Sequence, residues 1–329
     1  MIRILSYNIL AGGGRRVHQL TNIINSVQPD IVGLVEASKP QIVEEIAQSL
    51  GMHYRMSESY TQTYKGQTAL LSRLPILESQ AHYLSNKYVR SLLEVCIEEE
   101  DGHELTVFVT HLTAAFYQSR GGDGQRRREV QEILHIMASK KGTPHLVMGD
   151  FNAIAPGDRL QASALLRYLL IKDKQYRRNP YVDLGHPNLD SVIPESLRFL
   201  YPWMETISRN KLLSALLDKT GSLYASRGSI RLLRKAGYID CFRMNNPYDP
   251  GFTCPAGSLA GRIDYIFASP ELAERLSASY RITEGNGLHT EEASDHLPVV
   301  AEFGELAGVV NEPVHGVTTH RPVDVIDNV

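Results

Sequence analysis

Cysteine is scarce in this chain of 329 residues, which contains only Cys96, Cys241 and Cys254. Three cysteines that lie so far apart exclude a disulfide framework, and their spacing does not fit a zinc site. We therefore expect all three to be small buried side chains in a reducing compartment.

Long hydrophobic runs are absent as well. No apolar stretch approaches the roughly 20 residues that a helix needs to span a bilayer. The first ten residues, MIRILSYNIL, are typical of a core strand and not of a signal peptide. We therefore expect a cytoplasmic protein without a signal peptide or a transmembrane segment.

The chain also lacks a large excess of either charge. It has 34 Lys and Arg against 37 Asp and Glu, a net charge of −3. This balance argues against a strongly basic nucleic-acid-binding protein, although it leaves room for a local basic groove. The length allows one large domain or two smaller ones, and 43% hydrophobic residues are typical of a globular protein.

Apolar runs bounded by turn residues predict strands along most of the chain. We predict strands over residues 2–10, 31–37, 68–72, 75–83, 90–98, 104–111, 145–152, 262–268 and 297–303. Apolar residues at helical spacing predict helices over residues 15–27, 40–51, 124–142 and 270–276. Strands interleaved with helices favour a layered α/β body, but periodicity alone does not determine the order of strands in a sheet.

Residues 157–236 differ from this alternating pattern. They contain helical patches joined by HPN and YPW turns, so we predict a mostly helical insertion and not a separate domain. Residues 305–329 have weak periodicity and are expected to form a C-terminal arm or a disordered tail. We predict that residues 1–304 form one catalytic domain, which the insertion interrupts.

Two short strings combine an apolar strand with polar residues at its end. VMGDFNAIA at 147–155 carries Asp150 and Asn152, and ASDHLPVVAEF at 293–303 carries Asp295 and His296. Aspartate can bind a metal or activate water, and histidine can act as general acid or base. Together the strings indicate a metal-assisted phosphate-ester hydrolase.

Each of these polar residues has a plain structural alternative, namely a surface carboxylate, a Gly-Asp turn or a hydrogen-bonded core histidine. Their shared placement favours function, because polar residues in or at the ends of apolar strands recur throughout the chain. These residues are Asn8, Glu36, His111, Asp150, Asn152, Asp264, Asp295 and His296.

The ordered motifs SYN, LVEA, THL, GDFNA, RIDYIF and SDHLPV resemble the endonuclease/exonuclease/phosphatase superfamily. Its members include DNase I, AP endonucleases, neutral sphingomyelinases and inositol polyphosphate 5-phosphatases. The resemblance covers residues 1–304 apart from the insertion. It implies an α/β (α+β) fold of the DNase I type, a four-layer α/β/β/α sandwich of two mixed β-sheets with the site at one edge.

The resemblance also implies hydrolysis of a phosphoester with Mg²⁺ or Mn²⁺. Glu36 would be the principal metal ligand, assisted by Asn8 and Asp295. Asp150, positioned with Asn152, would align or deprotonate a water molecule.

The same resemblance assigns phosphate contacts. His296, oriented by Asp264, would contact the scissile phosphate or act as acid or base, and His111 would be a second contact. Arg90 would point into the cleft, with an exposed strand arginine as the alternative. Cys254 stands where tryptophan is usual in the family, and Asp240 matches a recurrent position with an expected structural role.

The substrate is less defined than the chemistry. The THL motif resembles the DNase I, sphingomyelinase and general phosphodiesterase branches more than AP endonucleases. The first helix of the insertion is basic, which suits either a polyanion or a solvated surface. Its apolar side is expected to pack on the body, and comprises Leu165, Leu166, Leu169 and Leu170.

Three functions therefore stay open. The first is a phosphodiesterase, with nucleic acid among the candidate substrates. The second is a lipid or inositol-phosphate hydrolase with peripheral membrane contact, and the third is a non-catalytic binding module. No obligate protein partner is implied.

Overall fold

The computed structural model describes residues 1–57, 67–84, 90–114, 116, 122–178, 189–193, 195–283 and 289–305, except for three side chains within those ranges. Among these residues, every helix is too short or too polar to cross a lipid bilayer. The expected C-terminal tail lies outside the described residues, apart from Glu305.

Two six-stranded sheets form the centre of the molecule. The first has the order β11-β12-β1-β2-β4-β3, with bounds β1 Ile2–Asn8, β2 Ile31–Val35, β3 His53–Met56, β4 Thr68–Ser72, β11 Leu276–Arg281 and β12 Val299–Phe303. The second has the order β5-β6-β7-β8-β10-β9, with bounds β5 Ile76–Leu84, β6 Arg90–Glu98, β7 Glu104–His111, β8 His145–Asp150, β9 Ile239–Asp240 and β10 Asp264–Ala268. Both sheets are mixed, because β1 pairs with β2 and β7 with β8 in parallel while the other pairs are antiparallel.

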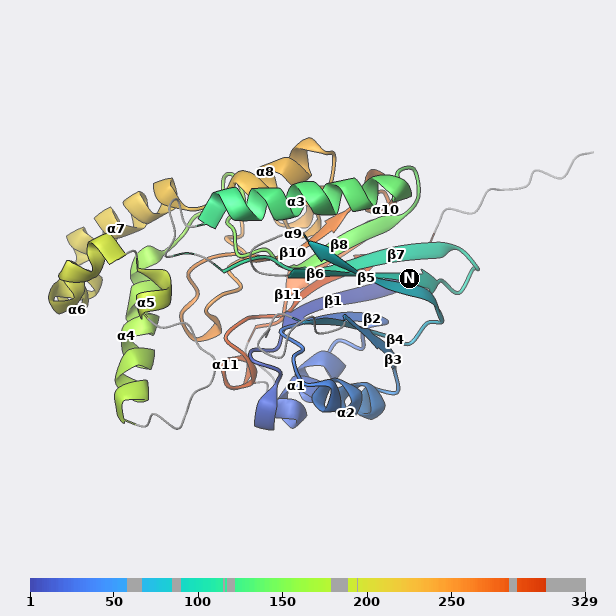
Figure 1. Cartoon of the computed structure of the whole chain (residues 1–329), viewed down its shortest axis with the longest axis horizontal. Helices are drawn as coiled ribbons and strands as arrows, with labels where there is room; N and C mark the ends of the chain where they lie inside the picture. The colour runs from blue at the N-terminus through green and yellow to red at the C-terminus, as the bar shows by residue number, and fades with distance from the viewer. Residues whose placement is uncertain are drawn as a thin grey trace, which may run out of the picture.

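Helices cover the outer face of each sheet (Figure 1). On the first sheet lie α1 (Val17–Asn25) and α2 (Pro40–Leu50), and on the second lie α3 (Asp123–Met137) and α8 (Gly228–Lys235). Helix α2 begins at a proline, whose fixed φ suits a first turn, and ends at Gly51 in the left-handed region. A third apolar core, which includes Ile4, Met148 and Ile266, fills the space between the sheets.

The predicted four-layer sandwich is therefore confirmed. Most predicted strands and helices are present with ends shifted by a few residues. Strands β3, β9 and β11 were not predicted. The sequences of β3 (HYRM) and β11 (LSASYR) lack a clear apolar run, and β9 has only two residues. The remaining short helical segments are η1 Gly14–Arg16, η3 Ala138–Lys140, α9 Cys241–Asn245, η5 Ala256–Ser258, α10 Pro270–Ala273 and α11 Thr290–Ala293.

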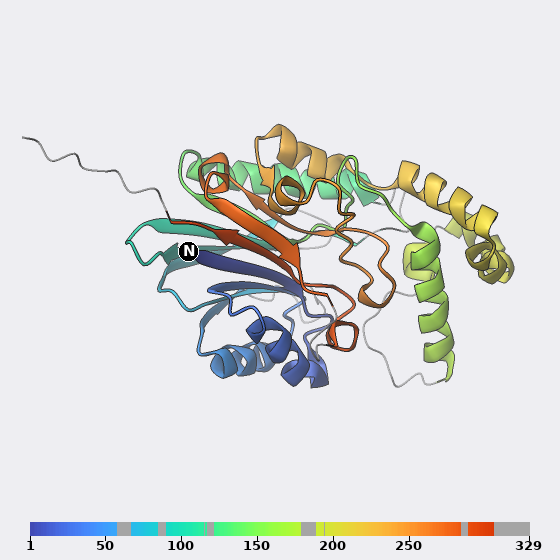
Figure 2. The same cartoon turned by 180° about the vertical axis from the view of Figure 1, so that it is seen from behind.

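The segment after β8 projects from one end of the sandwich, as both views show (Figures 1 and 2). Its elements are α4 Ala162–Arg178, α5 Leu189–Val192, η4 Glu195–Trp203, α6 Met204–Arg209 and α7 Lys211–Tyr224. The leucines of α4 do not pack on the body as expected. They join a small separate core with residues such as Leu189 and Met204 from the same segment, so these helices bury one another's apolar faces.

Candidate active site

Strand register places three of the predicted residues side by side in the second sheet. His111 pairs with Asp150 across β7 and β8, and Asp150 pairs with Asp264 across β8 and β10. All three are at most 6% exposed, and they lie at the same edge of the sheet. His111 Nε2 is 3.6 Å from Asp150 Oδ2, an ion-pair distance that is too long for a good hydrogen bond.

The first sheet contributes Asn8 and Glu36 to the same edge. Asn8, the last residue of β1, pairs with Val35, so Glu36 follows directly at the end of β2. The Asn8 amide Nδ2 lies 3.4 Å from Glu36 Oε1 and 3.2 Å from Asp150 Oδ2. A single buried asparagine therefore links the carboxylate of one sheet to that of the other.

The backbone is strained where two of these residues leave their strands. Glu36 has φ 59° and Asn152 has φ 48°, left-handed values that residues other than glycine rarely adopt. Ala11, also left-handed, donates its backbone N–H to Glu36 Oε2 at 2.6 Å. Such strain persists where surrounding contacts enforce it, and it concentrates at functional sites.

His296 is held from two sides. Its Nδ1 lies 2.8 and 3.0 Å from the two carboxylate oxygens of Asp264, while its backbone N–H donates to Ser294 Oγ at 3.2 Å. This leaves Nε2 directed toward the other carboxylates, 3.8 Å from Asp150 Oδ2 and 4.0 Å from Asp295 Oδ1. The structure thus brings His296, Asp264 and Asp150 into one cluster.

Burial and mutual repulsion shift the ionisation of this cluster. Burial and the neighbouring Asp264 carboxylate raise the pKa of Asp150 to about 7. Burial and the Asp295 charge raise the pKa of Glu36. Burial alone would lower the pKa of His296, but Asp264 outweighs it and raises that pKa well above the ordinary value. Several carboxylates are thus held together at an energetic cost that a bound cation would reduce.

The donor set suits a hard divalent cation. Carboxylate oxygens and the carbonyl oxygen of an asparagine amide are ligand types that Mg²⁺ and Mn²⁺ prefer. The amide oxygen of Asn8 accepts from the Leu10 N–H at 3.0 Å, and its Nδ2 faces the carboxylates. Among the His, Cys, Asp and Glu side chains in the described part of the chain, one group of three offers ligand atoms within 4.8 Å of one another: two carboxylate oxygens, from Asp150 and Asp264, and a ring nitrogen of His296. Glu36, the predicted principal ligand, is not in that group but is joined to it through Asn8.

Asn152 and Arg90 were also predicted to be site residues. Strand β8 ends at Asp150, so Asn152 lies beyond the strand. The backbone N–H of Asn152 donates to Asp150 Oδ1 at 2.8 Å, whereas its side-chain amide donates to Leu112 O at 2.9 Å. Asn152 therefore positions Asp150 through its backbone. The backbone of Arg90 begins β6, but its side chain lies outside the described residues.

Residues that the sequence did not single out surround the cluster. Arg16 donates to the backbone carbonyls of Leu10 and Ala293, and so fastens the loop after β1 to the segment before Asp295. Tyr168 and Lys172 of α4 reach the same region. Burial and the Asp295 charge raise the pKa of Tyr168, and burial lowers the pKa of Lys172 against the attraction of Asp295. Only the folded chain brings these segments together.

Helix α4 is held beside the site by contacts with η5. Ser258 Oγ donates to Ala164 O at 3.1 Å, and Ala256 N–H donates to Asp295 O at 2.7 Å. The Lys172 ammonium lies 5.3 Å from the centre of the Tyr168 ring. The first helix of the projecting segment thus forms a wall next to the cluster.

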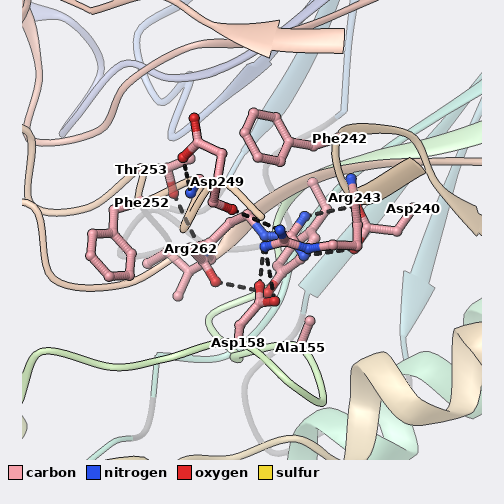
Figure 3. A network of polar contacts seen from close by, with 12 residues as sticks. Ala155, Asp158, Asp240, Phe242, Arg243, Asp249, Phe252, Thr253 and Arg262 are labelled. Atoms are coloured by element: carbon pink, nitrogen blue, oxygen red, sulfur yellow. Dashed lines mark hydrogen bonds and ion pairs between the residues drawn. The ribbon is translucent and has the colours of Figure 1, made fainter. Parts of the chain in front are cut away.

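A buried ion network ties the start of this segment to the second sheet (Figure 3). Arg262 Nε donates to Asp158 Oδ2 at 2.7 Å, and its two terminal nitrogens donate to the carboxylate oxygens of Asp240, each at 2.7 Å. Arg243 binds the other Asp158 oxygen at 3.0 Å, and Arg234 binds Asp240 at 2.9 Å. These contacts agree with the structural role expected for Asp240.

Cys254 lies beside His296. Burial raises the pKa of its thiol to about 12, although the charge of His296 and a hydrogen bond with it oppose that shift. The thiol is therefore neutral at physiological pH.

Comparison with known proteins identifies the family of the chain. The model of the endonuclease/exonuclease/phosphatase family matches residues 5–296. The chain belongs to this family. Its members are hydrolases of phosphoester bonds. No curated protein sequence matches the chain closely enough to count as a relative.

Several solved structures share the fold at low identity. One is an AP endonuclease from Archaeoglobus fulgidus, with 18% identity, 92% of this chain and 99% of that chain covered, and a TM-score of 0.57. Another is a 3′ phosphatase from Neisseria bound to a product DNA hairpin, with 18% identity, 93% and 100% covered, and a TM-score of 0.61. A third is truncated TDP2 from Caenorhabditis elegans, with 16% identity, 92% and 97% covered, and a TM-score of 0.53. At such identities the likeness establishes the fold alone.

Proposed function

We propose that this protein is a Mg²⁺- or Mn²⁺-dependent phosphodiesterase whose active site is the buried cluster at the common edge of the two sheets. The observation that carries the proposal is the convergence there of polar strand ends from both sheets, with Asn8 between Glu36 and Asp150. The catalytic domain is proposed to span residues 1–304. The insertion predicted over residues 157–236 includes α8, which packs on the second sheet, so the projecting part of it comprises α4 to α7.

In this proposal Glu36, Asn8 and Asp295 hold the metal. When bound, the cation neutralises charge on the phosphate oxygens, which is much of the catalytic task in phosphoryl transfer. The Ala11 N–H fixes one Glu36 oxygen and leaves the other toward the cluster.

Asp150 is the proposed residue that orients water and takes its proton. A carboxylate with a pKa near 7 can accept a proton at neutral pH, and the Asn152 N–H fixes which oxygen remains available. His296 would contact the scissile phosphate through Nε2 or exchange a proton there, because Asp264 occupies Nδ1. His111 would be a second phosphate contact, and Arg90 a third.

Nucleic acid is the leading candidate substrate, supported by the Neisseria 3′ phosphatase, which shares the fold and was solved with a DNA hairpin. A lipid or inositol phosphate ester is the second candidate, favoured by the exposed apolar side chains of the projecting segment. In either case Tyr168 and Lys172 are proposed to line the substrate path. Tyr168 would offer a flat aromatic surface and Lys172 a positive charge.

A hydrolysis panel tests the proposal. Wild-type protein and an Asp150→Asn variant would be incubated with Mg²⁺ or Mn²⁺ and plasmid DNA, single-stranded RNA, sphingomyelin, an inositol phosphate or bis-p-nitrophenyl phosphate. We expect hydrolysis of at least one ester, abolished by chelation and reduced by about 10²-fold or more in the variant. Asp101→Asn, a change of an exposed carboxylate, is the control. Wild-type inactivity on every substrate with both metals would favour a binding module.

A further inference from the structure

Exposed apolar side chains are concentrated on the projecting segment. Among the described residues, 15 large hydrophobic side chains are exposed, and ten of them lie between residues 171 and 224. That stretch is about one-sixth of the chain, so the concentration is unlike the single scattered hydrophobic residues of an ordinary surface.

Helix α7 carries the clearest part of this surface. Leu212, Leu216 and Leu223 are 82%, 58% and 75% exposed. Their spacing places them within about 40° of one another around the helix axis, and Lys219 falls in the same stripe. Leu217 points to the other side, where it packs against the core of the segment. The helix is capped by Asn210, which accepts from the N–H groups of Leu212 and Leu213, so the stripe lies on a well-formed helix.

Exposed aromatic residues also occur elsewhere on the projecting segment. Phe199 and Trp203 of η4 are 72% and 63% exposed, and Tyr224 at the end of α7 is 79% exposed. Tryptophan and tyrosine combine an apolar ring with a polar group, a combination that is favoured at the boundary between lipid and water.

The charge of the segment contrasts with that of the rest of the chain. Residues 159–224 contain ten Lys and Arg against six Asp and Glu, a net charge of +4 in a chain of −3. Local ion pairs engage acids and bases alike, because Glu205 pairs with Lys174 and Arg209 and Asp173 pairs with Arg177, so the positive excess remains. Basic residues beside exposed leucine and aromatic side chains are the composition of helices that lie on anionic membranes.

We propose that the α7 stripe docks this protein on the surface of an anionic lipid bilayer. A second copy of the chain fits this stripe less well. Lys219 lies near its middle, so a two-fold pairing would bring two ammonium groups close together across an apolar contact. On a bilayer the same lysine extends its long stem toward the phosphate headgroups. The docking does not depend on which ester the active site hydrolyses.

Vesicle flotation with the full chain tests this surface directly. Wild-type protein would be mixed with phosphatidylcholine vesicles that contain or lack phosphatidylserine. We expect binding to the anionic vesicles, weaker binding to the neutral ones, and a loss of binding as salt is raised. The triple variant Leu212→Gln, Leu216→Gln, Leu223→Gln should bind the anionic vesicles about tenfold or more weakly, because it removes the apolar contact while keeping good helix formers.

A matched control changes exposed apolar residues of the body. The double variant Met244→Gln, Tyr248→Gln alters side chains that are 58% and 96% exposed, and it should float like the wild type. Circular dichroism of each variant verifies that the helices remain. The proposal is overturned if the wild type stays unbound on anionic vesicles at low salt, or if the triple variant binds them as well as the wild type. Concentration-dependent dimerisation lost in the triple variant, without vesicle binding, would assign the surface to a second copy instead.

Discussion

At the scale of single residues, the site combines side chains of predictable type with backbone conformations that are not predictable. Glu36 and Asn152 each follow an apolar strand in the sequence, which marked them as candidates. Their left-handed φ values depend on contacts such as the Ala11 N–H to Glu36 bond, which joins segments 25 residues apart. Local sequence therefore identifies the residues, and only the folded chain shows how each is aimed.

Asp264 offers a prediction at this scale. Replacing it with asparagine removes the charge that stabilises protonated His296 and leaves only one of the two acceptor oxygens that hold Nδ1. We expect kcat to fall by about 10²- to 10⁴-fold in Asp264→Asn, with metal affinity changed much less, because the carboxylate is engaged with Nδ1.

Steady-state kinetics with bis-p-nitrophenyl phosphate, together with Mn²⁺ titration calorimetry, would measure both quantities. Asp101→Asn again serves as the control. A metal affinity that falls as much as kcat would identify Asp264 as a ligand and contradict its role in orienting the histidine.

At the scale of elements, the site depends on strand register. His111, Asp150 and Asp264 meet because β7, β8 and β10 pair in one register, and a shift by one residue would turn each side chain to the opposite face. The sequence indicated strands at these places, since their apolar runs are continuous. It could not indicate which strands are neighbours, because pairing is decided by contacts between distant segments.

Gly149 shows how tightly that register is built. It has φ +138°, and a Cβ there would lie 1.9 Å from the backbone oxygen of Thr110 on β7. We expect Gly149→Ala to lose about 3 kcal/mol or more of unfolding free energy, because neither backbone can move without breaking the ladder.

Urea denaturation followed by fluorescence would measure the loss. Gly124→Ala in α3 is the matched control, since a Cβ there meets open space and alanine favours a helix. Equal stability of the Gly149→Ala variant and the wild type would show that β7 and β8 do not approach as closely as described.

At the scale of the whole molecule, two sheets and one projecting segment must be held in fixed relation around the site. The four-layer sandwich could be predicted because the motifs from SYN to SDHLPV occur in the order that is typical of one family, and that family has this fold. The packing of α4 was not, because its leucines fit either the body or neighbouring helices, and the choice depends on long-range contacts. The expectation that they pack on the body was wrong for that reason.

The ion network at Asp158, Asp240 and Arg262 yields a prediction about pH (Figure 3). Burial alone would raise the pKa of Asp240, but Arg262 and the hydrogen bonds from Arg262, Arg234 and Arg243 outweigh it and hold that pKa below the ordinary value of 3.8. Folding therefore favours the ionised form. Its stabilisation is complete above the unfolded-state pKa and is lost as pH falls through the lower folded-state value.

We expect Asp240→Asn to lower the unfolding free energy at pH 7 by about 3–5 kcal/mol, because it leaves buried arginine charge unpaired. The difference from the wild type should shrink as the pH falls below about 4. Urea denaturation across this pH range measures it, with Asp101→Asn as an exposed control. A difference that stays constant down to acid pH would mean that the carboxylate charge is not the stabilising feature.

The most direct test of the central claim is the response of Mn²⁺ binding and phosphodiester hydrolysis to Glu36→Gln. Glu36 comes from the first sheet, whereas Asp150, His111 and Asp264 come from the second, so the claim requires both sheets to form one metal-dependent centre. The account predicts that Glu36→Gln binds Mn²⁺ about tenfold or more weakly and hydrolyses bis-p-nitrophenyl phosphate about 10²-fold or more slowly, with unchanged thermal unfolding. Wild-type Mn²⁺ affinity and wild-type activity in the variant would contradict it.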